Sequence, residues 1–390
     1  MSLAETARRL APQFAEQVTQ DRQLRRLSDA SWSLLLDNGL LRALQPARWG
    51  GAEVAMVEFI DMVMEVAKAS PAAGWVAGVV GVHPWQLGLF DDAAQADMWA
   101  GHATWMHSSS YNPTGRAEPV EGGYRVSGRW SFSSGCDHCQ AVNLGAIAGV
   151  QELGEGRSAP DFRSFLLLRE QYGIDDNWHV GGLQGTGSKD IVVEDAFVPN
   201  YRTQSHLDYA LGRPLPGRGV NSSPLYGMPF SVVFNMALAA SVLGSARGFI
   251  DGWIETNGPR RIGPGGAIAA DDPLVQRRIA EAQWNLDAAT LHLRSDARTL
   301  WDVAAAGEQS SELMRAQMRW NMNRGCELVS DSVMDLFRTG SGRALYLEHP
   351  LQARFQDVQA ALAHSYLLTD PLAKQLGGRL LGTSTPETVM

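Results

Sequence analysis

The chain has 390 residues, 45% of them hydrophobic and 19% charged, so it is long enough to bury a large core over two or three packed layers or domains. Its formal net charge is −9 and its pI is about 5.5, which argues against nucleic acid or an anionic membrane as a partner and favours a protein that handles small molecules. Its three cysteines are too few for a disulfide framework and indicate a reducing, cytoplasmic location.

Neither a signal peptide nor a membrane span is expected. The N-terminal residues are amphipathic and charged, without the apolar central run of a signal peptide. The apolar windows 73–90 and 230–250 are interrupted by polar side chains. Both therefore predict helices buried within a large helical protein.

The texture of the sequence changes twice along the chain. Residues 1–100 show helical spacing of apolar side chains, and residues 101–210 show short runs rich in Val, Ile, Phe and Trp between turn residues. Within this β-rich part, Glu152 to Asp161 is polar and is expected to form a surface loop. Residues 211–390 return to a helical pattern. The long helices predicted in this last part are Ser231–Asn257, Pro273–Gly307, Glu312–Arg338 and Pro350–Thr369. We therefore predict an α+β protein with an N-terminal helical domain, a middle β-barrel or sandwich domain and a C-terminal four-helix bundle.

The segment Ser127 to Cys139, SGRWSFSSGCDHC, alternates aromatic and hydroxyl side chains. A strand has a side-chain period of two, so we expect Trp130 and Phe132 on one face and Ser131 and Ser133 on the other. The pattern fits a buried strand ending in a turn. It also fits a platform for a flat aromatic cofactor, with rings against the cofactor's face and hydroxyls at its polar edge.

The same segment contains Cys136, His138 and Cys139 in a CDHC sequence. These residues are too close together to form a tetrahedral zinc site without a distant fourth ligand. A redox dithiol is typically found beside a βαβ unit, which the sequence does not predict here. We expect a role in packing and turn geometry and no metal site, although a scaffold protein using CDHC to hold a metal stays an alternative.

The order of helices, β domain and helical bundle resembles the acyl-CoA dehydrogenase fold, and local motifs agree over essentially the whole chain. YRVSGRWSFSSG resembles the family's flavin-contacting strand, and GLQGTGSKDIVVEDAFVP (182–199) resembles the segment that closes its β domain. FRTGSGRALYLEHPLQARFQDV (337–358) resembles its late Gly-rich turn and Arg-Asp pair. WSFSSGCDHC and AALAHSYLLTDP (360–371) are closer to the oxygenase components of two-component flavin monooxygenases, such as steroid-catabolic phenol hydroxylases and 4-hydroxyphenylacetate hydroxylases.

This resemblance implies an enzyme that uses reduced FMN or FAD and O2, through a C4a-hydroperoxide, to hydroxylate a phenolic or other electron-rich aromatic substrate, polycyclic ones included. A separate flavin reductase would supply the reduced flavin. Dehydrogenases need a carboxylate base, whereas this chain has His364 seven residues after Asp357. A His that titrates near neutral pH could hold or shuttle a proton there, so His364 is the first catalytic candidate. N-oxygenation, oxygenation of an indole and acyl-CoA dehydrogenation remain the alternatives.

The resemblance also implies a substrate pocket. In the matching oxygenases a His at the position of His83 contacts the phenolic oxygen, so His83 is the second catalytic candidate, as substrate orienter or base. His83 lies in a Gly- and Ala-rich apolar segment, where an imidazole needs a partner, so a satisfied core residue is the other interpretation. Trp85, Trp105 and Tyr111 are the candidates for the pocket wall.

The flavin contacts follow from the same resemblance. Ser109 and Ser134 correspond to hydroxyls at the N5 and C4-carbonyl edge of the flavin, with Ser108 and Ser110 as rivals of Ser109. Phe132 would pack against the ring.

Residues far along the chain would complete the flavin site. Arg260 or Arg261 would bind the flavin phosphate, since guanidinium groups recognise phosphate bidentately. The turn that contains Gly340 and Ser341 matches a segment that reaches the flavin of a neighbouring subunit, which implies a homotetramer.

Overall fold

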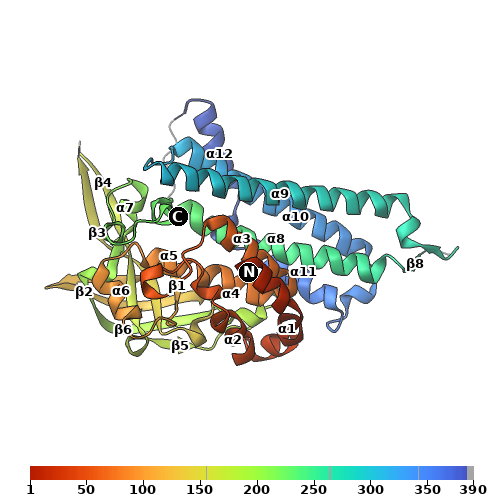
Figure 1. Ribbon diagram of the computed structural model, residues 1–390, viewed down its shortest axis with the longest axis horizontal. Coiled ribbons are helices and arrows are strands. Elements are labelled where there is room, and N and C mark those ends of the chain that lie inside the picture. Colours follow the sequence, from red (N-terminus) through yellow and green to blue (C-terminus); the bar gives the residue numbers. More distant parts are fainter. Residues whose placement is uncertain (155, 263–264, 341, 384–390) are drawn as a thin grey trace.

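The computed structural model describes residues 1–154, 156–262, 265–340 and 342–383 (Figure 1). The first hundred residues are helical, as the spacing of apolar side chains predicts. The α-helices here are α1 (Leu3–Leu24), α2 (Asp29–Asp37), α3 (Met56–Ala69), α4 (Pro71–Gly81), α5 (His83–Leu87) and α6 (Asp92–Trp99). Side-chain caps fix several starts: Ser70 accepts a hydrogen bond from the Ala73 N–H, and Pro71 occupies the first turn of α4.

The middle of the chain forms one seven-stranded sheet in the order β5-β6-β2-β1-β3-β4-β7. All neighbours are antiparallel except β1 and β3, which run parallel with Ser109 opposite Asn143. The strands are β1 (His107–Val120), β2 (Gly123–Ser133), β3 (Ala141–Gly154), β4 (Arg157–Leu168), β5 (Gly173–Asp175), β6 (Lys189–Pro199) and β7 (Thr203–Ser205).

The sheet curls around its own hydrophobic core, as a barrel or sandwich requires. The Tyr124 ring on β2 lies 5.3 Å from the Phe165 ring on β4, although two strands separate them in the sheet. The buried Trp130 indole donates a hydrogen bond to the Gly145 carbonyl at 2.7 Å. The prediction of a surface loop at Glu152 to Asp161 was wrong, because β3 and β4 stay paired out to Gly154 and Arg157 and form a long hairpin instead.

Long helices form the other end of the molecule (Figure 1). They are α8 (Phe230–Asn257), α9 (Pro273–Ala305), α10 (Glu312–Thr339), α11 (Pro350–Leu362) and α12 (Asp370–Leu380), with the hairpin β8 (Arg261–Ile262) and β9 (Ala267–Ile268) and the short helix α7 (His206–Ala210). The fourth predicted helix, Pro350–Thr369, was too long. The chain leaves the helix after Leu362, and a 3-10 turn (Ser365–Leu367) follows before α12 begins.

Helix α8 is the centre of the helical layer. It is long and apolar enough to cross a membrane by length and composition, but 89% of its most apolar window is buried inside the protein. That burial identifies α8 as a core helix.

The segment that closes the β domain packs directly on α11. A Cβ at Gly182 would lie 2.2 Å from the Gln356 carbonyl oxygen, so only glycine permits this approach. Next to it, Leu183 adopts a left-handed conformation, and its N–H donates to the buried Asp357 carboxylate at 2.6 Å. These contacts fix the sheet against the helix that leads to His364.

Candidate functional site

A bulge at the end of β2 turns Phe132 out of the strand. The pairing of β2 with β6 shifts register between Trp130 and Ser133, and Phe132 has a φ of 70°. Trp130 is fully buried whereas Phe132 is 66% exposed, so the prediction that both rings share one face was wrong. The bulge breaks the two-residue period. A left-handed Phe is strained, and such strain is concentrated at functional sites.

The exposed Phe132 ring does not stand alone. The Trp178 ring contacts it edge-on, with centroids 6.2 Å apart. The Phe132 carbonyl accepts a hydrogen bond from the Ser134 N–H at 3.1 Å, so a tight backbone turn links the aromatic pair to Ser134. An apolar ring surface beside hydroxyl and backbone polar groups fits the flat face and polar edge of a flavin.

Ser134 belongs to a chain of buried hydrogen bonds. Its hydroxyl accepts from the Trp75 indole N–H at 3.2 Å and shares a proton with the Ser188 hydroxyl at 2.7 Å, which in turn contacts Thr186 at 2.7 Å. The Trp75 ring lies 5.8 Å from the His364 ring. Helix α4 thus brings together Ser134 and His364, which are 230 positions apart in the sequence.

His364 sits at the start of the 3-10 turn with one ring nitrogen already used. Its Nδ1 accepts a hydrogen bond from the Tyr366 N–H at 3.2 Å, so in the neutral ring the proton is on Nε2. Burial lowers the pKa of His364 to about 4. The expectation that His364 titrates near neutral pH was therefore wrong, because desolvation disfavours the imidazolium. His364 is a neutral Nε2–H donor at physiological pH.

A buried asparagine pair holds the turn that carries His364. Asn323 on α10 donates to the carbonyls of Tyr366 and Leu368 at 2.8 and 2.9 Å. Its own carbonyl accepts from Asn235 on α8 at 2.9 Å, and both asparagines are fully buried.

The three consecutive serines of β1 differ in their surroundings. The Ser108 hydroxyl accepts from Ser133 at 2.9 Å, and the Ser110 hydroxyl donates to the Ser131 carbonyl at 2.7 Å. Both are buried, whereas Ser109 is partly exposed. Of the three, Ser109 is therefore the most accessible to a bound molecule.

His83 lies in a buried cluster of rings. Its ring is 5.0 Å from His107, 5.5 Å from Phe234 and 6.3 Å from Tyr111. Burial, and then the neighbouring His107, hold the pKa of His83 well below its usual value. The predicted wall residue Trp85 lies behind Phe234, with ring centroids 6.1 Å apart, and its indole donates to the Leu225 carbonyl at 2.8 Å.

Polar atoms in this cluster lack partners among the residues that the structure describes. They are Nδ1 of His83, both ring nitrogens of His107 and Oδ1 of Asn143. A buried polar atom without a hydrogen bond costs free energy. Their convergence on one region favours a site for a molecule that carries hydrogen-bonding groups.

Gln86 connects the cluster. Its side-chain carbonyl accepts from the Tyr111 hydroxyl and, at 3.4 Å, from the Asn143 amide, while its own amide donates to Ser164 at 3.4 Å. Burial, and to a lesser degree the charge of the nearby Tyr366, raises the pKa of Tyr111, so Tyr111 stays protonated. The Tyr366 ring lies 6.1 Å from the His364 ring, so Tyr111 beside His83 and Tyr366 beside His364 are near enough to influence each other electrostatically.

Other predicted residues lie elsewhere. Trp105 stacks on His102 at 4.1 Å and belongs to a separate apolar cluster with Trp49 and Trp99. Its cluster does not include His83, so the structure does not bring Trp105 to the candidate pocket.

Arg260 and the Gly340 turn meet at the far end of the bundle. The Arg260 guanidinium donates to the Thr339 carbonyl at 2.9 Å, and the exposed Arg261 donates to the Gly266 carbonyl at 3.0 Å. Figure 1 shows the β8 hairpin and the sheet at opposite ends of the molecule. Ser341 lies outside the described residues.

The CDHC segment is used for packing. His138 stacks on Trp32 at 4.7 Å, and its Nε2 hydrogen-bonds the Leu27 carbonyl at 2.9 Å. Cys136 and Cys139 belong to two different core clusters. No group of three or more metal-ligating side chains occurs in the described part of the chain.

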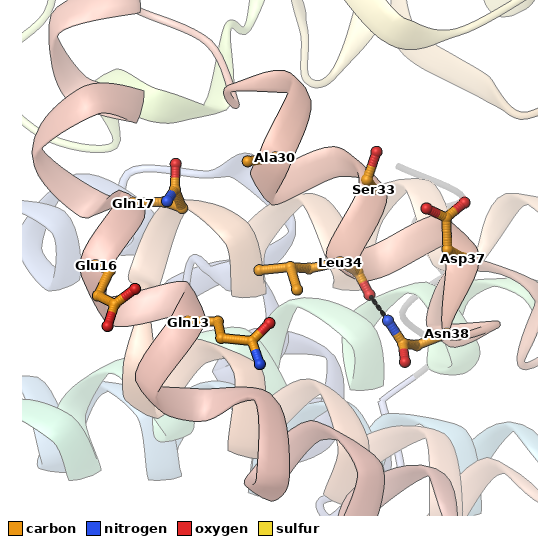
Figure 2. Close-up of a pocket in the computed structure, with 8 residues that line it drawn as sticks. All are labelled: Gln13, Glu16, Gln17, Ala30, Ser33, Leu34, Asp37 and Asn38. Atoms are coloured by element: carbon orange, nitrogen blue, oxygen red, sulfur yellow. Dashed lines mark hydrogen bonds between the residues drawn. The ribbon is translucent and has the colours of Figure 1, made fainter.

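A surface pocket of about 290 Å³ lies between α1 and α2, lined by Gln13, Leu34 and Asn38 among others (Figure 2). Its Asn38 amide donates to the Leu34 carbonyl at 3.0 Å, so the group is locally satisfied. None of the predicted site residues lines this pocket. The candidate site is therefore the region that joins the exposed Phe132 ring to His364 and the buried His83.

Residues that the sequence did not single out complete this region: Trp75, Gln86, His107, Ser188 and Tyr366. Trp75 and Gln86 lie in apolar helical segments, where a buried polar side-chain atom needs a hydrogen-bond partner. That requirement is the sequence signal that could have identified both residues. Their partners, Ser134 and Ser164, come from distant strands.

Comparisons with known proteins agree with this geometry. Residues 236–368 match the family model described as Acyl-CoA dehydrogenase, C-terminal domain. The oxygenase subunit HsaA of a flavin-dependent monooxygenase from Rhodococcus jostii (strain RHA1) is 38% identical, over 91% of this chain and 92% of that protein. The oxygenase component of an FADH(2)-dependent resorcinol hydroxylase from Rhizobium sp. (strain MTP-10005) is 31% identical, over 96% of this chain and 92% of that protein.

A solved structure matches as well. The crystal structure of 3-HSA hydroxylase from Rhodococcus sp. RHA1 has a TM-score of 0.93 and 35% identity, covering 100% of this chain and 99% of that chain. The predicted acyl-CoA dehydrogenase-like fold is thereby confirmed, and the relatives are oxygenases rather than dehydrogenases. The chain belongs to the oxygenase subunits of the flavin-dependent monooxygenases.

Proposed function

We propose that the chain hydroxylates a phenolic or similarly electron-rich aromatic compound, using O2 and reduced FMN or FAD delivered by a separate cytoplasmic reductase. The observation that carries the proposal is a pair of uncharged groups of imidazole and phenol side chains, one around His83 and Tyr111 and one around His364 and Tyr366, the second beside Trp75 and Ser134. Neutral donors in a buried site suit a neutral ring with a hydroxyl substituent. The resorcinol hydroxylase among the relatives is named for such a compound.

Phe132, Ser109 and Ser134 would hold the flavin ring. Phe132 offers an exposed apolar face in a strained conformation, and the hydroxyls of the two serines lie on the accessible side of β1 and at the end of β2. The bound reduced flavin supplies the electrons that divide O2 between the hydroxylated product and water.

His364 would donate its Nε2–H to oxygen held at the flavin. The Tyr366 N–H keeps Nδ1 occupied, and burial keeps the ring neutral, so the donor stays in place across physiological pH. Trp75 positions the neighbouring Ser134 through its indole N–H. The buried surroundings exclude water, which favours transfer of oxygen to the substrate over release of hydrogen peroxide.

His83 would orient the phenolic oxygen of the substrate. Its unpartnered Nδ1 can accept the phenol proton or donate to the phenolate oxygen, depending on the tautomer. The rings of Phe234 and Tyr111, with Trp85 behind them, would form the wall of the pocket.

The Arg260–Gly340 corner would serve the flavin of a second copy of the chain. Its position beside β8, at the opposite end of the molecule from the sheet, supports a contribution across a subunit interface, and thus a homotetramer (Figure 1). Arg260 keeps a buried Nε atom without a hydrogen bond in the described residues, so it retains capacity for a phosphate.

A screen tests the proposed function directly. The purified chain, a flavin reductase, NADH and O2 are incubated with a panel of phenols, indoles and acyl-CoA thioesters. We expect hydroxylated phenols that depend on the chain. Flavin reduction driven by an acyl-CoA, or products formed only from indoles, would contradict the proposal.

A further inference from the structure

Helix α7 places a second buried histidine in the aromatic cluster. The His206 ring lies 4.4 Å from Phe162, 5.0 Å from Phe230 and 5.7 Å from Tyr111, and His206 is 1% exposed. The Tyr209 ring stacks on Phe230 at 4.6 Å. Phe230 in turn stacks on Phe234, which contacts His83, so the cluster is continuous from α7 to the proposed phenol site.

The hydrogen bonds around His206 determine which ring nitrogen carries the proton. The Ser164 hydroxyl accepts from the Gln86 amide, and its oxygen lies 2.7 Å from Nε2 of His206. Among the described residues Nε2 of His206 is the acceptor within reach of the Ser164 hydroxyl proton, so the arrangement that satisfies this proton has Ser164 donating to Nε2. Burial lowers the pKa of His206 to about 3, so the ring is neutral and its proton is on Nδ1.

This Nδ1–H is a buried donor for which no described residue supplies an acceptor. The Tyr209 hydroxyl is likewise buried and makes no hydrogen bond of standard geometry within the described ranges, and the Gln86 side chain is its polar neighbour. Two such groups on one short helix, both in contact with Phe230, would be costly unless a ligand satisfies them.

The charges near α7 are already paired. Asp161 binds Arg163 at 2.7 Å, and Asp208 binds Arg213 at 3.2 Å. A carboxylate placed beside His206 would therefore have no uncompensated cation from these residues to offset its desolvation. A neutral oxygen acceptor would meet this requirement without that cost.

We propose that His206 and Tyr209 form a second polar subsite, which binds a neutral oxygen such as a ketone on a part of the aromatic substrate remote from the ring held by His83. This inference rests on the proposed function and adds a substrate class: phenols that carry a neutral hydrogen-bond acceptor away from the ring. Ser164 acts as a positioning residue, because it holds the His206 tautomer.

Three phenols test the subsite with the complete reductase–oxygenase system. The ketone 4-(4-hydroxyphenyl)butan-2-one is compared with 4-butylphenol, which lacks the oxygen, and with 3-(4-hydroxyphenyl)propanoate, which carries a charge. A purely apolar pocket would favour 4-butylphenol, because the ketone loses its hydrogen bonds to water. We expect kcat/KM to be about tenfold higher for the ketone than for 4-butylphenol, the effect of one or two neutral hydrogen bonds, and lowest for the propanoate.

Variants assign the preference to the subsite. His206→Phe and Tyr209→Phe should bring the ketone-to-alkyl ratio toward one while changing kcat/KM for 4-butylphenol less than about twofold. Tyr172→Phe is the matched control, because Tyr172 also has a buried hydroxyl without a hydrogen bond in the described part of the chain but lies in the core of the sheet. It should leave the ratio unchanged.

The outcomes separate the two proposals. Three results would overturn the subsite: equal kcat/KM for the ketone and 4-butylphenol, a preference for the propanoate, or a ketone preference that survives both Tyr209→Phe and His206→Phe. In each case, hydroxylation of the phenols would still support the proposed function. If His206→Phe loses its cooperative thermal unfolding, Tyr209→Phe alone decides. If none of the phenols is hydroxylated, the proposed function fails and the subsite fails with it.

Discussion

Replacing Asn323 with Leu removes the anchor of the turn that carries His364. The substitution keeps the side-chain size but leaves the carbonyls of Tyr366 and Leu368 without their donor and the Asn235 amide without its acceptor. A buried polar group left without a partner costs about 1–3 kcal/mol. Leu368 is half exposed, so water can replace the lost donor to its carbonyl. The Tyr366 carbonyl and the Asn235 amide together predict that the free energy of unfolding falls by about 3 kcal/mol.

The loss has two readouts. Urea unfolding followed by tryptophan fluorescence should show Asn323→Leu to be about 3 kcal/mol less stable than the parent protein. The yield of hydroxylated product per reduced flavin consumed should also fall, because the turn no longer holds His364 beside Trp75.

Asn235→Leu is the matched control. It removes one of the three hydrogen bonds and one buried oxygen that has no partner in the described residues, while both contacts from Asn323 to the turn remain. We expect a loss near 1 kcal/mol and an unchanged product yield. A loss below about 1 kcal/mol for Asn323→Leu, or equal product yields in the two variants, would refute the reasoning.

Three further predictions concern the imidazoles and the indole of the site. His364→Asn should lower the product yield per reduced flavin on the order of 100-fold. In the parent protein this yield should be constant from about pH 6 to 9, because the pKa of His364 is about 4. A bell-shaped pH profile centred near pH 7 would contradict this. His107 has a pKa lowered by burial to about 3 against 6.5 when unfolded, so its stabilising contribution is present above pH 6.5 and is lost as the pH falls toward 3. Between pH 7 and 5 this loss is about 2 kcal/mol, and His107→Phe should reduce the fall in unfolding free energy by that amount; identical pH slopes in urea titrations would disprove it. Trp75→Phe removes the donor to Ser134 and should cost about 1 kcal/mol of stability and lower the product yield several-fold, whereas a yield equal to the parent's would show that the indole N–H is not needed.

The order of helices, sheet and helices could be predicted because it depends on local periodicity. His364 and Ser134 could be selected from short motifs. The bulge at Phe132 could not, because its cause is a register shift relative to β6, a strand about 60 residues further along the chain. A two-residue period assumes regular pairing, which the sequence of one strand does not guarantee.

Contacts between segments that are distant in the sequence could not be predicted either. Trp75 reaches Ser134 only because α4 packs beside the end of β2, and Gln86 on α5 reaches Ser164 on β4. The low pKa of His364 depends on burial by the folded chain, so a sequence-based expectation used the ordinary value of a histidine. Residue type indicated the chemistry of the site, but tertiary packing determined protonation and partners.

The most direct test of the account is a single turnover in ¹⁸O2. Chemically reduced flavin is mixed with the chain, 4-(4-hydroxyphenyl)butan-2-one and ¹⁸O2, and the products are analysed by mass spectrometry. The account predicts one ¹⁸O atom in a hydroxylated product, formed in a yield close to that of the flavin added and strongly reduced in His364→Asn. Oxidation of the flavin with release of hydrogen peroxide, and no labelled product above the control without protein, would contradict it.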